Sequence, residues 1–148
     1  MTCMKELLAL VLVIGALCAS CAAHVEEANV PAPETVSWQE ADYDSILRDP
    51  LAYTGYRVRV YGKVLQVSPD SEDSSRKVMR LGTGGYGTSD NVFWISFCAK
   101  DVDREISRDD MVTVFGECLG ARTYASVTGY LFTVPVVRAD RIIPGKAE

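Results

Sequence analysis

Residues 56–67 have the sequence YRVRVYGKVLQV, and this alternation of apolar and polar side chains is typical of a half-buried β-strand. The apolar face carries Val58, Val60 and Val64, and the opposite face carries Arg57, Arg59, Tyr61 and Lys63. Gly62 lies where the pattern changes phase, because Leu65 and Val67 are apolar on what had been the polar face. A glycine at such a point indicates a bulge or a bend. A long bent strand that precedes four shorter ones predicts a small closed β-barrel.

The amino terminus has the features of an export signal. Lys5 precedes an unbroken apolar run, Leu7–Leu17, which is shorter than a membrane span. The run ends in LCASCAA, which resembles a bacterial lipobox; in that motif the cysteine, here Cys21, becomes the lipid-modified first residue after cleavage. The third position before it is a cysteine, where the lipobox usually has leucine. We therefore expect a lipid-anchored protein of the cell envelope, and the alternative is ordinary cleavage after Ala22 or Ala23 with secretion.

Composition divides the chain into three segments. Residues 1–20 form the export signal, and residues 21–36 form a flexible tether, which has two prolines, three glutamates and no hydrophobic periodicity. The only histidine, His24, lies in this tether and is expected to be solvated. Residues 37–148 are enough for one domain with its own core. A formal net charge of -5 disfavours phosphate backbones and anionic membranes as partners.

The folded segment begins with a predicted short helix. Ser37 and Glu40 have the spacing of a capping box, so the helix should begin at Ser37 and end near Arg48. Pro135 should lie at an edge or a bend, because proline cannot donate to a β-ladder. The strands expected after the first one are Arg76–Leu81, Asn91–Cys98, Met111–Cys118, and a hairpin of Arg122–Val127 and Tyr130–Val137 around Thr128–Gly129, with Ala139–Ile143 closing the chain.

Two motifs in this segment have a structural interpretation. Gly82–Gly87 matches G-x-G-x-x-G, but a strand follows it, whereas a dinucleotide site requires a helix there. We expect a glycine-rich hairpin loop instead. The connection Ala99–Asp110 contains five aspartates and glutamates, yet it lacks the turn glycine and the terminal glutamate of a calcium loop. It is expected to be a solvated connection, and we predict neither a metal nor a cofactor.

The order of these motifs resembles a family, the small OB-fold domains of bacterial lipoproteins and secreted proteins, which are similar to anticodon-binding OB folds. The resemblance covers about residues 42–143. Its marks are YDSILRDPLAYTGYRVRVYGKVLQV, DNVFWISF and DDMVTVFGECLGARTYASVTGYLFTVPVVRADRI. It implies an all-β fold, a five-stranded Greek-key barrel with a short N-terminal helix. It implies neither an enzymatic activity nor one ligand class.

OB folds bind oligonucleotides or oligosaccharides across one face, so the first functional hypothesis is an exported binding module with an unknown extracellular ligand. The candidate face alternates cations and an aromatic ring: Arg57, Arg59, Tyr61 and Lys63, with Arg80 alongside. The alternative is a solvated strand face that protects the sheet edge. The acidic loop 68–75 favours this alternative, because it would repel phosphate. We expect single-stranded nucleic acid to bind weakly at best.

The second hypothesis is an envelope protein that docks to a partner protein. Its anchors would be exposed aromatic side chains among Tyr86, Tyr124 and Tyr130, unless these rings pack on the domain. The third hypothesis, an enzyme, is disfavoured because the single histidine lies in the tether and the sequence has no catalytic grouping. We therefore predict no catalytic residues.

The folded segment contains two cysteines, Cys98 and Cys118, each at the end of a predicted strand. Export places them where disulfides persist, so an even number of cysteines is compatible with a bridge. The third and fourth strands of an OB barrel are not simple hairpin neighbours, however, and a bridge requires Cα atoms within about 7 Å. The sequence leaves both a disulfide and two reduced thiols open.

Overall fold

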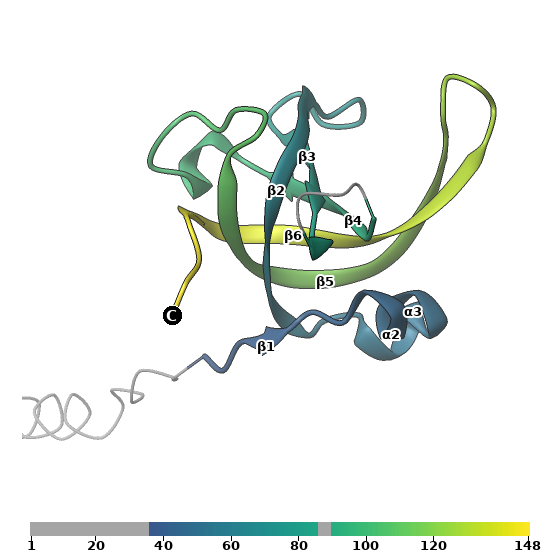
Figure 1. Ribbon diagram of the computed structural model, residues 1–148, viewed down its shortest axis with the longest axis horizontal. Coiled ribbons are helices and arrows are strands. Elements are labelled where there is room, and N and C mark those ends of the chain that lie inside the picture. The colour runs from purple at the N-terminus through teal and green to yellow at the C-terminus, as the bar shows by residue number, and fades with distance from the viewer. Residues whose placement is uncertain (1–35, 86–89) are drawn as a thin grey trace, which may run out of the picture. The chain divides into compact units, whose positions relative to one another are not determined.

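The computed structural model describes residues 36–85 and 90–148 (Figure 1). The export signal, residues 21–35 of the tether with Cys21, and Tyr86 lie outside the described residues. The described elements are β1 (Gln39–Glu40), α2 (Tyr43–Arg48), α3 (Pro50–Tyr53), β2 (Arg57–Pro69), β3 (Lys77–Gly82), β4 (Val92–Phe97), the 3-10 turn η2 (Ala99–Asp101), β5 (Met111–Ala125) and β6 (Leu131–Pro144). Over these residues, no helix has the length and apolar character needed to cross a membrane.

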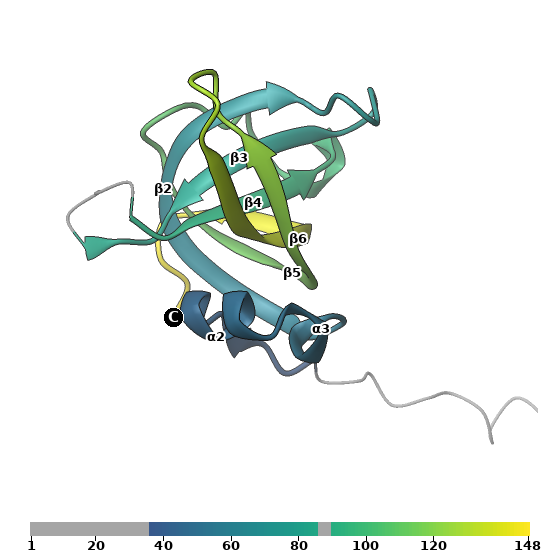
Figure 2. The same ribbon diagram turned by 90° about the vertical axis from the view of Figure 1, so that its right-hand side faces the viewer.

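The strands form one mixed sheet that closes into a ring. Their order is β1-β2-β3-β4-β6-β5, and β5 pairs back with β2. The long strand β2 closes this ring, because its first half, Arg57–Lys63, pairs with β5 and its second half, Lys63–Pro69, pairs with β3. Figures 1 and 2 show β2 curving past both neighbours. The all-β prediction and the long first strand are therefore confirmed.

Gly62 lies where β2 passes from one neighbour to the other. A Cβ atom at this position would lie 2.3 Å from the carbonyl oxygen of Gly82, a distance that real Cβ atoms do not reach. The bulge lies slightly further on, between Val64 and Gln66 in the register with β3. Glycine at position 62 therefore permits the close approach of two strands. The change in which face of β2 carries the apolar side chains takes place at the bulge.

The core fills the inside of the ring. Val58, Val60 and Val64 of β2 are buried, as their alternation predicts. Burial of such side chains supplies about 1.5–3 kcal/mol each relative to exposure. The largest fully buried side chains elsewhere in the core include Met79, Leu81, Phe93, Ile95 and Val137.

The helix starts later than predicted. Residues Gln39–Glu40 form β1, which pairs in parallel with β2, so Ser37 caps no helix. The N-cap of α2 is Asp42, whose carboxylate accepts hydrogen bonds from the amides of Asp44 (3.2 Å) and Ser45 (3.4 Å). The capping-box prediction was wrong because strand pairing with β2 takes up the backbone of those residues, which local propensity alone does not register. Helix α2 contributes the fully buried Ile46 to the core.

The second half of the chain forms two long strands, where the sequence predicted several shorter ones. β5 and β6 pair along their whole length, with register shifts at Phe115/Gly116 and at Cys118/Gly120. Gly120 has a positive φ of 98°, which a side chain would strain. The two strands end in a hairpin turn at 126–130, as predicted; the Ser126 amide donates to the Tyr130 carbonyl at 2.8 Å. We call residues 121–135 the hairpin arm, and Figure 1 shows it extending beyond β4.

Pro135 lies where the hairpin arm separates from β4. The parallel ladder between β4 and β6 pairs Trp94, Ile95 and Ser96 with Val136, Val137 and Arg138, and it includes no residue before Val136. A proline at position 135 has no N–H with which to extend that ladder. Pro135 itself is buried and lies opposite Ala121 of β5. The prediction that it marks an edge is confirmed on its β4 side.

Candidate binding groove

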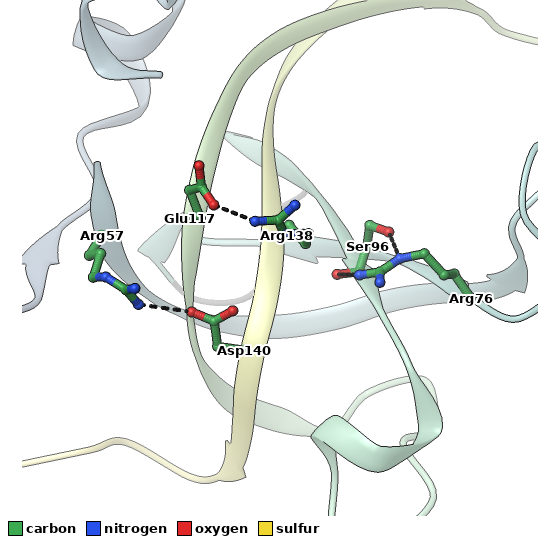
Figure 3. Close-up of polar contacts among 6 residues, drawn as sticks. All are labelled: Arg57, Arg76, Ser96, Glu117, Arg138 and Asp140. Atoms are coloured by element: carbon green, nitrogen blue, oxygen red, sulfur yellow. Dashed lines mark hydrogen bonds and ion pairs between the residues drawn. The ribbon is translucent and has the colours of Figure 1, made fainter. Parts of the chain in front are cut away.

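The predicted basic face of β2 lies where β2 pairs with β5, and β6 pairs with the other side of β5. Arg57 forms an ion pair with Asp140 at 3.2 Å, and its guanidinium lies 5.6 Å from the ring centroid of Trp38. Next to it, Glu117 and Arg138 form a second ion pair (Figure 3). These charges alternate in sign across neighbouring strands, an arrangement that stabilises the sheet surface.

The other members of this face also have partners or acidic neighbours. Lys63 pairs with Asp109 at 3.2 Å, and the Tyr61 ring lies 5.9 Å from the ammonium of Lys146. Arg59 lines a hollow of about 310 Å³ together with three carboxylates, those of Glu40, Asp42 and Asp44. The surface therefore carries mixed charge, without the continuous positive potential that a polyanion groove requires.

Arg80 does not belong to this face. It lies on β3, opposite Gln66 of β2 and Trp94 of β4, whereas the four predicted residues of β2 pair with β5. Its guanidinium lies over the Tyr124 ring, 4.6 Å from the centroid. The expectation that it lies alongside the β2 residues is wrong, because β2 changes neighbours at Lys63 and turns its two halves toward different strands.

Arg80 is part of an aromatic–arginine cluster beneath the hairpin arm. The cluster consists of Arg80, Trp94, Arg122, Tyr124 and Phe132. The Arg122 guanidinium lies 4.5 Å from the Trp94 ring centroid, and the rings of Trp94 and Tyr124 are 5.5 Å apart. Tyr124 also stacks on Phe132 with centroids 5.8 Å apart. Such cation–aromatic contacts hold a guanidinium in one orientation while its N–H groups remain available for hydrogen bonds.

The arm and the outer side of β3 and β4 enclose a groove of about 610 Å³. Figure 2 shows the arm crossing β3 and β4. Arg80 is the one charged side chain among the described residues that line the groove, and no carboxylate is among them. The lining residues are Tyr43, Gln66, Arg80, Asn91, Val92, Tyr124, Ala125, Ser126, Val127, Phe132, Thr133 and Val134. The groove therefore combines one cation, neutral hydrogen-bonding groups and aromatic walls, which suits a ligand with a single anionic group.

Two neighbours modify the electrostatics of this groove. Tyr43 lies at one end of the groove, and its ring packs edge-on against Phe93 with the ring centroids 5.5 Å apart. The pKa of its hydroxyl is raised, mainly by burial and also by the nearby Asp44 carboxylate. Tyr43 is therefore neutral and can donate a hydrogen bond at neutral pH. Near the cluster, Glu72 lies 3.7 Å from Arg122 and offsets the charge of that arginine. Arg80 is the cation that a ligand would meet.

The predicted aromatic anchors have separate positions. Tyr124 is half-buried in the cluster, so the interpretation that it packs on the domain is right for this residue. Tyr130 is exposed at the tip of the hairpin arm, together with Val127, Leu131 and Phe132. Sequence reasoning overlooked Trp94, Arg122 and Phe132; the alternation of Arg122 with Tyr124 on one strand face was the available signal.

The two cysteines of the folded segment are free thiols. Cys118 lies on β5 opposite Val137 of β6, and Cys98 follows β4, which lies on the other side of β6. Two strand spacings separate β4 from β5, about 9.5 Å, which is more than a disulfide allows. The disulfide that the sequence left open is therefore not formed, because β6 lies between the two residues.

The two thiols also differ in environment. Cys118 is fully buried, and this burial raises the pKa of its thiol. Cys98 is partly exposed, and its Sγ accepts a hydrogen bond from Nη1 of Arg76 at 3.2 Å. The Nε of the same arginine donates to the Ser96 hydroxyl at 2.8 Å (Figure 3). Within the described ranges, no three His, Cys, Asp or Glu side chains are grouped so that they could hold a metal ion.

Comparisons with known proteins give a distant structural likeness. No family model matches the chain. No curated protein matches it either. Among solved structures, an OBody bound to hen egg-white lysozyme is similar over 78% of this chain and 96% of its own, with 17% sequence identity and a TM-score of 0.42.

Proposed function

We propose that the chain is an exported, lipid-anchored binding module built on an OB-fold-like barrel. The five strands β2–β6 form a closed ring, and the ring order β2-β3-β4-β6-β5 supports a five-stranded Greek-key barrel. OB folds bind their ligands on the face of their second and third strands, between the first and the fourth connecting loops. The groove of this protein lies on β3 and β4, beneath the loop between β5 and β6, which is the corresponding place.

The observation that carries this proposal is the groove itself, with Arg80 as its one charged lining residue. Tyr124 holds the Arg80 guanidinium, so little side-chain entropy is lost when a ligand binds it. The geometry supports binding of an anionic group by Arg80 and of an apolar or flat group by Tyr124 and Phe132. It does not depend on catalysis, and we propose no reaction.

A paired substitution tests which surface binds. Arg80→Gln removes the groove cation, and Arg59→Gln removes a cation of the β2 face, so each variant is the control for the other. Binding of sialyllactose, a sugar with one carboxylate, and of its neutral counterpart lactose is measured by calorimetry. The proposal expects binding that Arg80→Gln weakens and Arg59→Gln leaves unchanged. Loss with Arg59→Gln alone would return the site to the β2 face.

The proposal includes export and anchoring at Cys21. Intact-mass analysis of membrane-extracted protein should show a chain that begins at Cys21 and carries added acyl mass. A mature chain that begins at Ala23 or His24, free in the medium, would contradict the anchor and favour secretion.

The same proposal predicts weak binding of single-stranded nucleic acid. The loop between β2 and β3 carries Asp70, Glu72 and Asp73, and Glu72 already pairs with Arg122 beside the groove. A phosphate chain on this face would therefore meet carboxylates. Submicromolar, salt-sensitive binding of oligothymidylate that disappears with Arg59→Ala or Lys63→Ala would contradict this prediction.

A second candidate function is docking to an envelope protein through the tip of the hairpin arm. The observation that favours it is the group of exposed apolar side chains at that tip, Val127, Tyr130, Leu131 and Phe132. Under this alternative, Tyr130→Ser with Leu131→Ser would abolish association with an envelope partner. Arg80→Gln would leave that association unchanged.

A further inference from the structure

The groove exists because β4 and β6 separate at Pro135. Beyond the pair Trp94–Val136 the ladder stops, although both strands continue. β4 continues to Val92 and β6 to Leu131. Each strand pairs there on one side only among the described residues, β4 with β3 and β6 with β5. The gap between them is therefore bordered by two strand edges.

On β6, the backbone groups of this edge can be assigned from the register. The Ser126 amide donates to the Tyr130 carbonyl and the Ser126 carbonyl accepts from the Gly129 amide, so the backbone groups of Ser126 face the opposite strand. Hydrogen-bonded and non-hydrogen-bonded pairs alternate in antiparallel strands, so Phe132 faces β5 with its backbone, and Leu131 and Thr133 face away from it. The Thr123 and Thr133 hydroxyls are 2.8 Å apart, which agrees with a close, non-hydrogen-bonded pair.

On β4 the same argument applies to Val92. The Thr83 amide donates to the Asn91 carbonyl at 3.1 Å just beyond the ends of β3 and β4, so the backbones of these two residues face each other. By alternation, the backbone N–H and C=O of Val92 point away from β3, toward the β6 side. Val92 and Thr133 both line the groove.

We propose that this groove takes an extended polypeptide segment, which adds as a strand to the β6 edge at Leu131–Thr133 and places one carboxylate on Arg80. A free strand edge offers donors and acceptors at the spacing of another backbone, which a sugar or a nucleotide chain does not match. Alternate side chains of the segment point toward the rings of Tyr124 and Phe132. The inference rests on the proposed function and names the partner class of the same groove.

The charges around the groove limit the segment to one carboxylate near Arg80. Asp44 lies beside Tyr43 at one end, and Glu72 lies beside Arg122 near the other. A run of acidic residues would be repelled by both. A single Asp, Glu or terminal carboxylate meets the groove cation alone, as a charge-assisted hydrogen bond requires.

The experiment uses the full chain in phosphatidylcholine nanodiscs. A synthetic library of heptapeptides is screened, and the tightest peptide is resynthesised with a fluorescent label for anisotropy. Two N-methylated forms of it are then compared, with methyl groups on the odd or on the even backbone amides. Strand addition uses only every second residue of the peptide, so one methylated form should lose binding while the other keeps it.

The protein variants test the second half of the proposal. Arg80→Gln should lower the affinity for the peptide by about tenfold or more, which is the effect of losing one charge-assisted hydrogen bond. Arg59→Gln should leave this affinity unchanged. Equal effects of the two methylation patterns, or no effect of Arg80→Gln, would overturn the proposal. If sialyllactose binds in an Arg80-dependent manner and no peptide does, the binding groove stands and the peptide class fails. If nothing binds in an Arg80-dependent manner, both fail.

Discussion

Replacing Gly62 with alanine perturbs the point on which ring closure depends. At this residue β2 leaves β5 and joins β3, and the added Cβ would lie 2.3 Å from the Gly82 carbonyl oxygen and 3.1 Å from Cγ of Leu81. The nearest contact is backbone, so no flexible side chain can move aside. The two strands must separate by at least about 0.7 Å for the contact to reach 3.0 Å.

The cost can be estimated from three terms. Overpacking of a well-packed core typically costs about 1–3 kcal/mol. Weakening of a backbone hydrogen bond between β2 and β3 adds up to about 1 kcal/mol. Alanine regains about 0.5–1 kcal/mol over glycine in a strand through the unfolded-state entropy. We therefore expect Gly62→Ala to lower the free energy of unfolding by about 2 kcal/mol.

Urea unfolding followed by circular dichroism measures this loss, provided that the transition is two-state. The matched control is Gly85→Ala, because a Cβ there meets no atom within 4 Å, and we expect a change of less than about 0.5 kcal/mol. If both variants have the same stability, the close approach at Gly62 does not constrain the fold, and the explanation of its glycine is wrong.

The remaining predictions concern the helix cap and the thiols. Asp42→Ala should lower the urea midpoint of unfolding through the lost N-cap, whereas Ser37→Ala should leave that midpoint unchanged; the reverse result would restore the capping box. Hydrogen bonds from the Ser45 hydroxyl and amide lower the pKa of Asp42 below its ordinary 3.8, so its stabilisation is complete above that value and is lost as the pH falls through the folded pKa. The difference between wild type and Asp42→Ala should thus disappear in acid, and a difference that persists there would contradict the ionised cap. Iodoacetamide at pH 8 should modify the partly exposed Cys98 before the buried Cys118, whose pKa is raised, and peptide mapping measures this order. Unfolding without reductant should make both thiols reactive, and a linked 98/118 peptide would contradict the free thiols.

Much of the fold could be predicted from local pattern. The alternation of Val58, Val60 and Val64 placed β2 correctly, because a strand that is buried on one face must alternate. The turn at Thr128–Gly129 was predictable because glycine readily adopts the positive φ that such a turn needs, and Gly129 has a φ of 85°. The helix start was not predictable, because the pairing of β1 with β2 depends on where a distant strand lies.

The candidate site was predicted less well. Arg80 was singled out, but on the wrong surface, and its true neighbours Tyr124 and Phe132 come from strands more than 40 residues later. The Arg57 and Lys63 side chains met Asp140 and Asp109, partners that no short-range pattern could assign. Ion pairs between distant strands depend on register across the ring, and one residue of slip would exchange every partner.

The sequence by itself determined the first long strand with its buried face, the hairpin turn at Thr128–Gly129 and the edge position of Pro135, because each of these expresses a local steric or periodic constraint. Only the tertiary structure decided that β6 lies between Cys98 and Cys118, and that the arm folds over Arg80. Both results follow from ring closure, which sets the distance between residues by the order of strands around the sheet and not by their separation along the chain.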